Sequence, residues 1–233
     1  MTSRVLARSA LAAAAVSVAA FSALTAASPA SAAPSQALQI LYSATGSTTL
    51  SKSDSHAVIT FAPATLQSFV TFNPDNTGSV KAYLPLAPVT ASFKAYGFLP
   101  ARGTVVFTQV GAATGKLGEY DTETGFPLSV TAKYVVTLRD VVIGGAKADV
   151  GTNCQTVRPL TVTITAEPGF DLSTGVLNGT YDLSRFTNCG QASTIINDTV
   201  PGRGNSLSLA IQFAGGANRA AMTAASPAAS VAR

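Results

Sequence analysis

The stretch that decides the fold is LSVTAKYVVTLR, at residues 128–139. Alternate positions, from Leu128 through Tyr134 to Leu138, are apolar, and those between them carry Ser, Thr, Lys or Arg, with Val135 as the exception. Because successive side chains of a β-strand point to opposite faces, this alternation predicts a strand with one face buried and the other in water.

The same two-residue period recurs along residues 37–213, where no segment shows a sustained helical period. Clear strands are predicted at 89–97, 160–167 and 207–213, and weaker ones at 38–44, 57–62, 66–72, 79–84, 104–110 and 177–183. Turn residues separate them, at 73–78, 111–115, 144–145, 168–169 and 173–175. About ten short strands with one wet face predict an all-β fold, an antiparallel β-sandwich, with a β-barrel as the alternative.

The composition excludes some classes of partner. The chain has 233 residues, of which 47% are hydrophobic and 11% charged, against roughly 25% charged in an ordinary soluble domain. The net charge of +4 comes from the two ends, because residues 37–213 hold eleven Lys or Arg and eleven Asp or Glu. The basic residues form no run, so nothing predicts nucleic-acid binding or a basic membrane-surface patch.

The two ends of the sequence differ from its middle. Residues 1–32 combine Arg4 and Arg8, an Ala-rich apolar stretch, Pro29 and an Ala-Ser-Ala site, which predicts a cleaved signal peptide and a secreted protein. Ala is weakly apolar, so a transmembrane span is not expected in the mature chain. The β domain is expected at residues 37–213, and a disordered Ala-rich tail at 214–233.

Cys154 and Cys189 are the only two cysteines. In the oxidising space outside the cell, an even pair most often forms a structural disulfide. A reactive thiol would need a nearby base, and a zinc site would need more ligands, yet His56 is the single histidine. We therefore predict a disulfide between these cysteines and no metal or cofactor.

Three groups of residues are candidates for chemistry. Glu119, Asp121 and Glu123 alternate, so an extended chain would direct all three carboxylates to one side, toward Ca²⁺ or toward a glycoside, although a solvated hairpin explains them as well. His56 follows Asp54 and Ser55, but neighbours on a strand point apart and cannot form a catalytic triad simply. The glycines at 202–205 are expected to form a turn before a strand.

The aromatic residues leave two interpretations of the interior open. Six phenylalanines and one tyrosine are expected to fill the core: Phe61, Phe69, Phe72, Phe93, Phe98, Phe107 and Tyr134. Alternatively, they line a hollow barrel or groove that holds an apolar ligand.

Several short stretches resemble a group of secreted actinobacterial β-domain proteins with Ala-rich leaders. The stretches are VTASF at 89–93, GFLP at 97–100, TNC at 152–154, GTY at 179–181, NCG at 188–190 and PGRGNSL at 201–207. The resemblance implies an exported, disulfide-bonded β domain and supplies no catalytic residues.

Together these observations predict a secreted or cell-envelope protein, without enzymatic activity, that binds an extracellular protein or glycan through its surface. The alternative is a carrier of a lipid-like apolar molecule in a barrel or between sheets. A hydrolase that uses the acidic residues at 119–123 is the remote alternative.

Overall fold

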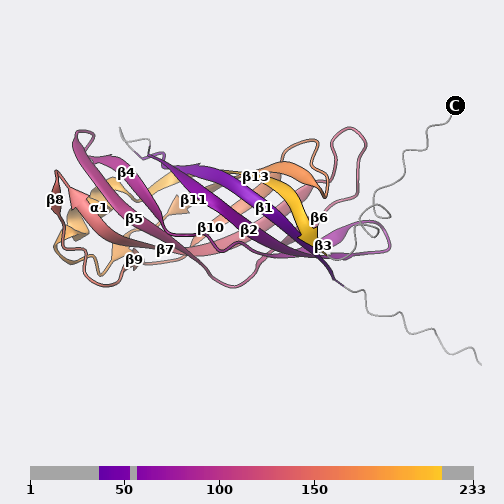
Figure 1. Cartoon of the computed structure of the whole chain (residues 1–233), viewed down its shortest axis with the longest axis horizontal. Helices are drawn as coiled ribbons and strands as arrows, with labels where there is room; N and C mark the ends of the chain where they lie inside the picture. Colours follow the sequence, from indigo (N-terminus) through magenta and orange to yellow (C-terminus); the bar gives the residue numbers. More distant parts are fainter. Residues whose placement is uncertain (1–36, 53–56, 217–233) are drawn as a thin grey trace, which may run out of the picture. The chain divides into compact units, whose positions relative to one another are not determined.

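The computed structural model describes residues 37–52 and 57–216, all within one compact unit, Ser35–Arg233 (Figure 1). Its strands are β1 (Leu38–Thr49), β2 (Val58–Phe72), β3 (Gly78–Tyr83), β4 (Val89–Ala95), β5 (Leu99–Gln109), β6 (Ala113–Leu117), β7 (Leu128–Ile143), β8 (Ala146–Lys147), β9 (Cys154–Thr156), β10 (Leu160–Ala166), β11 (Thr174–Leu183), β12 (Phe186–Thr187) and β13 (Gly202–Gly216). A 3₁₀ turn, η2 (Gly190–Ala192), and a short helix, α1 (Ser193–Thr199), lie between β12 and β13.

Eight of the strands close into an antiparallel barrel. The order is β10–β11–β13–β1–β2–β3–β6–β7, and pairing of β7 with β10, for example Val130 with Ile164, closes the ring. The 16-residue β7 is long enough to pair with two strands, one after the other, along one edge. Its first half pairs with β6, and its second half with β5, which carries β4 on its other edge. The all-β antiparallel prediction is confirmed, and the barrel is the architecture that forms.

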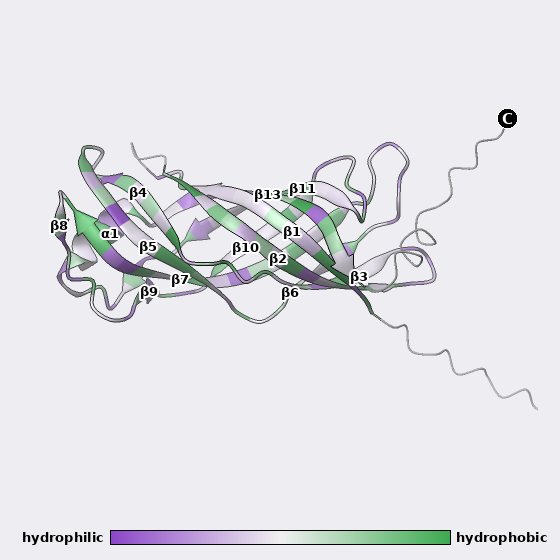
Figure 2. Ribbon diagram, viewed as in Figure 1, coloured by the Kyte–Doolittle hydropathy of each residue, from purple (hydrophilic) through white to green (hydrophobic). Residues whose placement is uncertain are grey.

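The alternation of side chains explains why these residues form the wall. In β7, Val130, Ala132, Tyr134, Val136 and Leu138 are buried, as the two-residue period predicts. Figure 2 shows the same alternation as bands of hydrophobic and hydrophilic residues along β5 and β7. One face of each strand therefore builds the interior, and the other meets solvent.

Several element boundaries differ from the prediction. The segments predicted at 57–62 and 66–72 are one strand, β2, which continues through a bulge opposite Ala44 and Gly46. The glycines at 202–205 belong to β13, which runs on to Gly216, and residues 217–233 lie outside the described residues. Helix α1 was not predicted, because seven residues are too few to show a helical period.

Gly46 is required where β1 pairs with β13, opposite Leu209. A Cβ built there would lie 2.1 Å from the carbonyl oxygen of Ser208. The absent side chain lets the β1 and β13 backbones approach closely, next to the β1–β2 bulge that bends the strand as barrel closure demands.

Cys154 and Cys189 form the predicted disulfide, which is confirmed. Both are fully buried and join β9 to the turn after β12. The side chain of Asn197 in α1 also holds β12, because it accepts a hydrogen bond from the Phe186 N–H (2.7 Å) and donates one to the Phe186 carbonyl (3.0 Å).

Candidate functional site: the barrel interior

The interior contains three connected groups of apolar side chains, each around a small hollow. The largest hollow has a volume of about 70 Å³ and is lined by residues from all eight barrel strands, among them Leu66, Ala82, Ala132, Leu177 and Ile211. Two smaller hollows, of about 40 and 30 Å³, follow toward β4 and α1. An eight-stranded barrel is just wide enough to be filled by side chains or to hold one small ligand.

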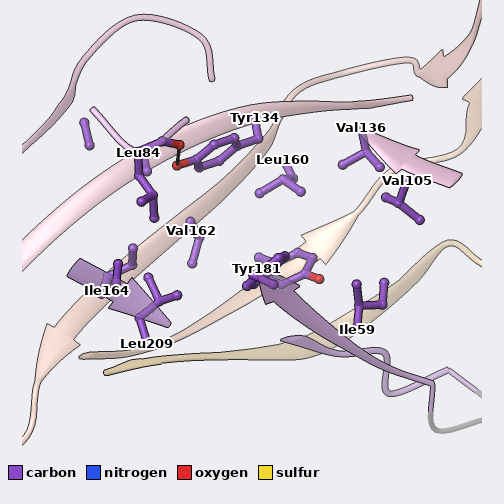
Figure 3. Close-up of a cluster of buried hydrophobic side chains, with 14 of the residues drawn as sticks. Ile59, Leu84, Val105, Tyr134, Val136, Leu160, Val162, Ile164, Tyr181 and Leu209 are labelled. Atoms are coloured by element: carbon purple, nitrogen blue, oxygen red, sulfur yellow. Dashed lines mark hydrogen bonds between the residues drawn. The ribbon is translucent and has the colours of Figure 1, made fainter. Parts of the chain in front are cut away.

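Three buried tyrosines, Tyr42, Tyr134 and Tyr181, hereafter the core tyrosines, bring hydroxyl groups into this apolar space. Tyr42 donates to the Leu172 carbonyl (3.1 Å), and Tyr134 donates to the Leu84 carbonyl (3.3 Å; Figure 3). Burial raises the pKa of all three phenols, that of Tyr134 to about 12. The three phenol hydroxyls are therefore uncharged, and they donate their hydrogen bonds to groups of the protein itself.

The third core tyrosine belongs to a short hydrogen-bonded chain. Thr48 donates its hydroxyl proton to the Ser206 carbonyl (2.7 Å), so Tyr181 donates to the Thr48 hydroxyl, 2.6 Å away. Tyr134 and Tyr181 divide the interior, because Tyr134 borders the two larger hollows and Tyr181 the two smaller ones. Movement of these two rings and of Phe107 would join the hollows end to end.

A two-loop cap, formed by residues 118–127 and 167–173, closes the barrel beyond the largest hollow. The Phe126 N–H donates to the Phe170 carbonyl (2.8 Å), and the ring of Phe126 packs on Tyr120 at 4.9 Å between centroids. Phe170 and Leu172 line the hollow directly. The cap thus seals this end with apolar side chains.

The predicted acidic residues lie in this cap. The Asp121 carboxylate accepts hydrogen bonds from the Thr124 N–H (2.8 Å), the Glu123 N–H (2.9 Å) and the Thr124 hydroxyl (3.0 Å). These bonds, the Thr124 N–H first, lower the pKa of Asp121. Across residues 37–52 and 57–216, no three His, Cys, Asp or Glu side chains are placed to share a metal ion. The geometry is that of an exposed turn, in which Asp121 holds the loop.

The barrel wall has a seam at which β2 and β4 face each other. β3 pairs only with Gln67–Phe72 of β2, and β4 pairs with β5, so in the described part of the chain no ladder joins β4 to the start of β2. The two strands nevertheless pass within 8 Å, Cα to Cα. Phe61 of β2 and Phe107 of β5 close the gap with rings 5.5 Å apart, edge to face.

Gln109 strengthens one end of this seam. Its side-chain oxygen accepts from the Leu84 N–H (2.7 Å), and its amide donates to the Ala82 carbonyl (2.9 Å). The side chain thereby takes the place of a strand beside residues 82–84, between the end of β5 and the start of β6. Sequence reasoning did not single out Gln109, because an isolated amide carries no pattern.

The aromatic predictions are partly correct. Phe61 and Tyr134 are buried, and Phe72, Phe93 and Phe107 pack against the core. Phe98, however, is 74% exposed at the β4–β5 turn. Phe69 is half-buried and stacks edge to face on Tyr83, 6.5 Å away, outside the core cluster. Asp54, Ser55 and His56 lie outside the described residues.

A second concave feature lies on the outer wall, across β1, β13, β11 and β10. This hydroxyl face is a shallow groove of about 570 Å³ lined by Ser47, Thr49, Thr163, Thr165, Asn178, Thr180, Ser206 and Ser208, with Gly179 and Leu207. Its side chains come into rows because Thr49 pairs with Ser206, Ser206 with Thr180, and Thr180 with Thr163. The face is polar and carries no charge.

No known protein family, curated protein or solved structure matches this chain. Among the residues described, no helix is long and apolar enough to cross a bilayer.

Proposed function

We propose that the protein binds a slender apolar molecule, such as a short alkyl or isoprenoid chain, inside its barrel and carries it without changing it chemically. The observation that carries this proposal is the apolar hollow of about 70 Å³ beside Ala82 and Ala132, whose core tyrosines are already hydrogen-bonded to the protein. An apolar cavity stays dry and favours apolar guests.

The energetics favour an occupant. Empty core volume costs about 24 cal/mol per Å³, so the largest hollow alone costs on the order of 2 kcal/mol. A guest that fills it recovers dispersion contacts that the lining side chains otherwise lack. Drug-sized ligands need roughly 300–1,000 Å³, so the guest must be thin, or it must displace Tyr134 and Phe107 to occupy the three hollows in a row.

The β2–β4 seam is the access route that this function requires. Neighbouring strands of the barrel ring are joined by backbone ladders, whereas across this seam the described residues pack through side chains, among them the Phe61–Phe107 pair. Separating packed side chains at the seam breaks no ladder, so opening the wall here costs fewer backbone hydrogen bonds than parting two paired strands. The confirmed disulfide suits an oxidising compartment, which supports a site of action outside the cytoplasm.

A cavity-filling variant tests the proposal. Fluorescence titration with cis-parinaric acid, a polyene whose 18-carbon chain would need all three hollows in a row, should show saturable binding to the wild type. Ala132→Leu places a larger side chain in the hollow and should weaken binding at least tenfold, while the unfolding free energy falls by no more than about 1 kcal/mol because the added methylenes enter existing space.

The matched control is Ala62→Leu, which adds the same atoms at an exposed position of β2 and should bind the probe like the wild type. Native mass spectrometry of protein from its own host should also show an apolar guest. Absence of probe binding to the wild type, or equal binding by Ala132→Leu, would reject the proposal.

The hydroxyl face favours a second candidate function, binding of a neutral glycan at the surface. Its rows of uncharged hydroxyls suit sugar hydroxyls, and they cover four adjacent strands. Co-sedimentation with insoluble polysaccharides, comparing the wild type with Thr163→Val/Thr180→Val, tests it. Loss of co-sedimentation in the variant supports this function, and no co-sedimentation of the wild type dismisses it.

A further inference from the structure

The β4–β5 turn exposes two aromatic side chains at its tip. Phe98 is 74% exposed and Tyr96 51%. In the described part of the chain, neither ring stacks on another aromatic ring. Single exposed apolar residues are ordinary, but two large rings within three residues at the tip of a hairpin form a protruding apolar knob.

The backbone at this tip holds an aromatic residue, Tyr96, in a strained conformation with positive φ. Tyr96 and Gly97 have φ values of 53° and 80°, and the Phe98 N–H donates to the Ala95 carbonyl (3.3 Å). A turn with two consecutive residues at positive φ prefers Asn-Gly, because most residues with a Cβ are disfavoured there. The protein should therefore be less stable with Tyr at position 96 than with Asn. Strained backbone conformations are concentrated at functional sites.

Three cations share the outer face beside this knob. Pairing places Arg102 opposite Val142, and Val142 opposite Lys147, in one row across β5, β7 and β8. Lys94 lies on the same face of the β4–β5 ladder, two residues along from Ser92, the partner of Arg102. The sequence contains no run of basic residues, so this cluster arises only when the strands pair.

The surroundings leave this charge unbalanced. Residues 76–118 contain no Asp or Glu, nor do residues 141–148; Asp140 and Asp149 flank the second segment. Within the described residues, none of the three cations makes an ion pair. Between Lys94 and Arg102 lies an open concavity of about 660 Å³, with Phe93, Pro100 and Val142 among its walls.

The β7–β8 turn supports the knob from the side. The Gly144 N–H donates to the Pro100 carbonyl (2.8 Å), and Leu99 lies close against Gly144. In Figure 1, β4, β5 and β8 lie together at the end of the barrel away from β3. Knob and cations therefore form one surface, hereafter the tip surface: Lys94, Tyr96, Phe98, Arg102 and Lys147.

We infer that the tip surface docks on an anionic lipid membrane, with Tyr96 and Phe98 in the interfacial region and Lys94, Arg102 and Lys147 against lipid phosphates. Aromatic rings favour the headgroup level of a bilayer, and each cation close to an anionic surface strengthens binding about fivefold. An uncharged or cationic partner would leave the three positive charges without complement. This docking is independent of the proposed interior ligand.

Vesicle co-sedimentation of the full chain tests the inference. Vesicles of phosphatidylcholine with 30 mol% phosphatidylglycerol should bind the wild type, and added salt should weaken that binding. Lys94→Ser/Arg102→Ser should lower the partition coefficient about 25-fold on these vesicles, at fivefold per cation. Residues 1–36 are common to all variants, so a difference between variants reports the tip surface.

The aromatic knob is tested separately. Phe98→Ser should weaken vesicle binding at least tenfold, because it removes apolar area that would leave water. Tyr96→Asn should relieve the turn strain, so it should weaken vesicle binding while the urea unfolding midpoint stays equal or rises. That combination separates a docking role from a folding defect.

Two matched controls remove the same kinds of side chain at exposed positions outside the tip surface. Val157→Ser removes a 60% exposed apolar side chain, and Lys133→Ser removes an exposed cation of β7; both should bind vesicles like the wild type. Wild-type protein that ignores anionic vesicles would overturn the inference. So would tip variants that bind as the wild type does, or tighter binding to soluble polyglutamate that Phe98→Ser leaves unchanged, which would indicate an acidic protein partner.

Discussion

Removal of the disulfide should destabilise the protein by an amount set by the loop it closes. Cys154 and Cys189 are 35 residues apart, and that segment includes two barrel strands, β10 and β11. The chain-entropy relation gives a loss of about 13 cal/mol/K for this separation, or about 4 kcal/mol at 25 °C. A domain of this size has an unfolding free energy on the order of 10 kcal/mol, so the variant should fold with much reduced stability.

Urea unfolding of Cys154→Ala/Cys189→Ala, followed by circular dichroism, measures this loss. With a slope of about 2 kcal/mol/M, the midpoint should fall by about 2 M without a change of slope. Wild-type protein unfolded and refolded under reducing conditions is the control, since it keeps both sulfur atoms and loses only the cross-link. A double variant with an unchanged midpoint would refute the loop-entropy reasoning, and a reduced wild type as stable as the oxidised one would do the same.

Three further changes have outcomes that the structure determines. Gly46→Ala should unfold or strongly destabilise the barrel in urea, because its Cβ would lie 2.1 Å from the Ser208 carbonyl oxygen; a stable variant would contradict the close approach. The core tyrosines have raised pKa values, that of Tyr134 reaching about 12. Their contribution to stability is therefore complete below about pH 10 and is lost as pH rises through their pKa values in the folded state. In an alkaline titration, the tyrosinate absorbance of these residues should appear only when the protein unfolds. Hydrogen bonds lower the pKa of Asp121, so its carboxylate stabilises the cap above about pH 4, and this effect is lost as pH falls through the pKa of the folded state. In Asp121→Asn, the urea unfolding midpoint should therefore fall less steeply with decreasing pH than in the wild type.

The strands were predictable because their signal is local. In β7 every second residue is apolar, and the same residues are buried in the barrel. Closure was not predictable, because it depends on which strand pairs with which. The double use of β7 by β6 and β5 leaves no mark in the sequence, and an alternating strand fits a sandwich and a barrel equally well.

The candidate site divides in the same way. The disulfide could be predicted from the presence of two cysteines. The hollow beside Ala132 could not, because it is the small space that the side chains of eight strands together leave unfilled. Phe98 shows the limit of residue type as a guide. Its hydrophobicity favours the core, but Phe98 lies in the turn between β4 and β5, which leaves its ring in solvent.

The unpaired edge at the seam needs an explanation, because free strand edges invite association with other chains. Two features of the sequence reduce that risk. Pro63 lies in the bulge of β2 and has no N–H to offer, and Pro88 directly precedes β4. The Phe61–Phe107 pair then covers the gap with side chains instead of a ladder. Such an edge is blocked against other strands yet not hydrogen-bonded to its own neighbour. It suits the access route that we propose, because its opening would not expose an unpaired strand to other chains. β4 forms one side of this seam and also leads into the tip surface, so a membrane that held the tip would also hold one side of the proposed access route.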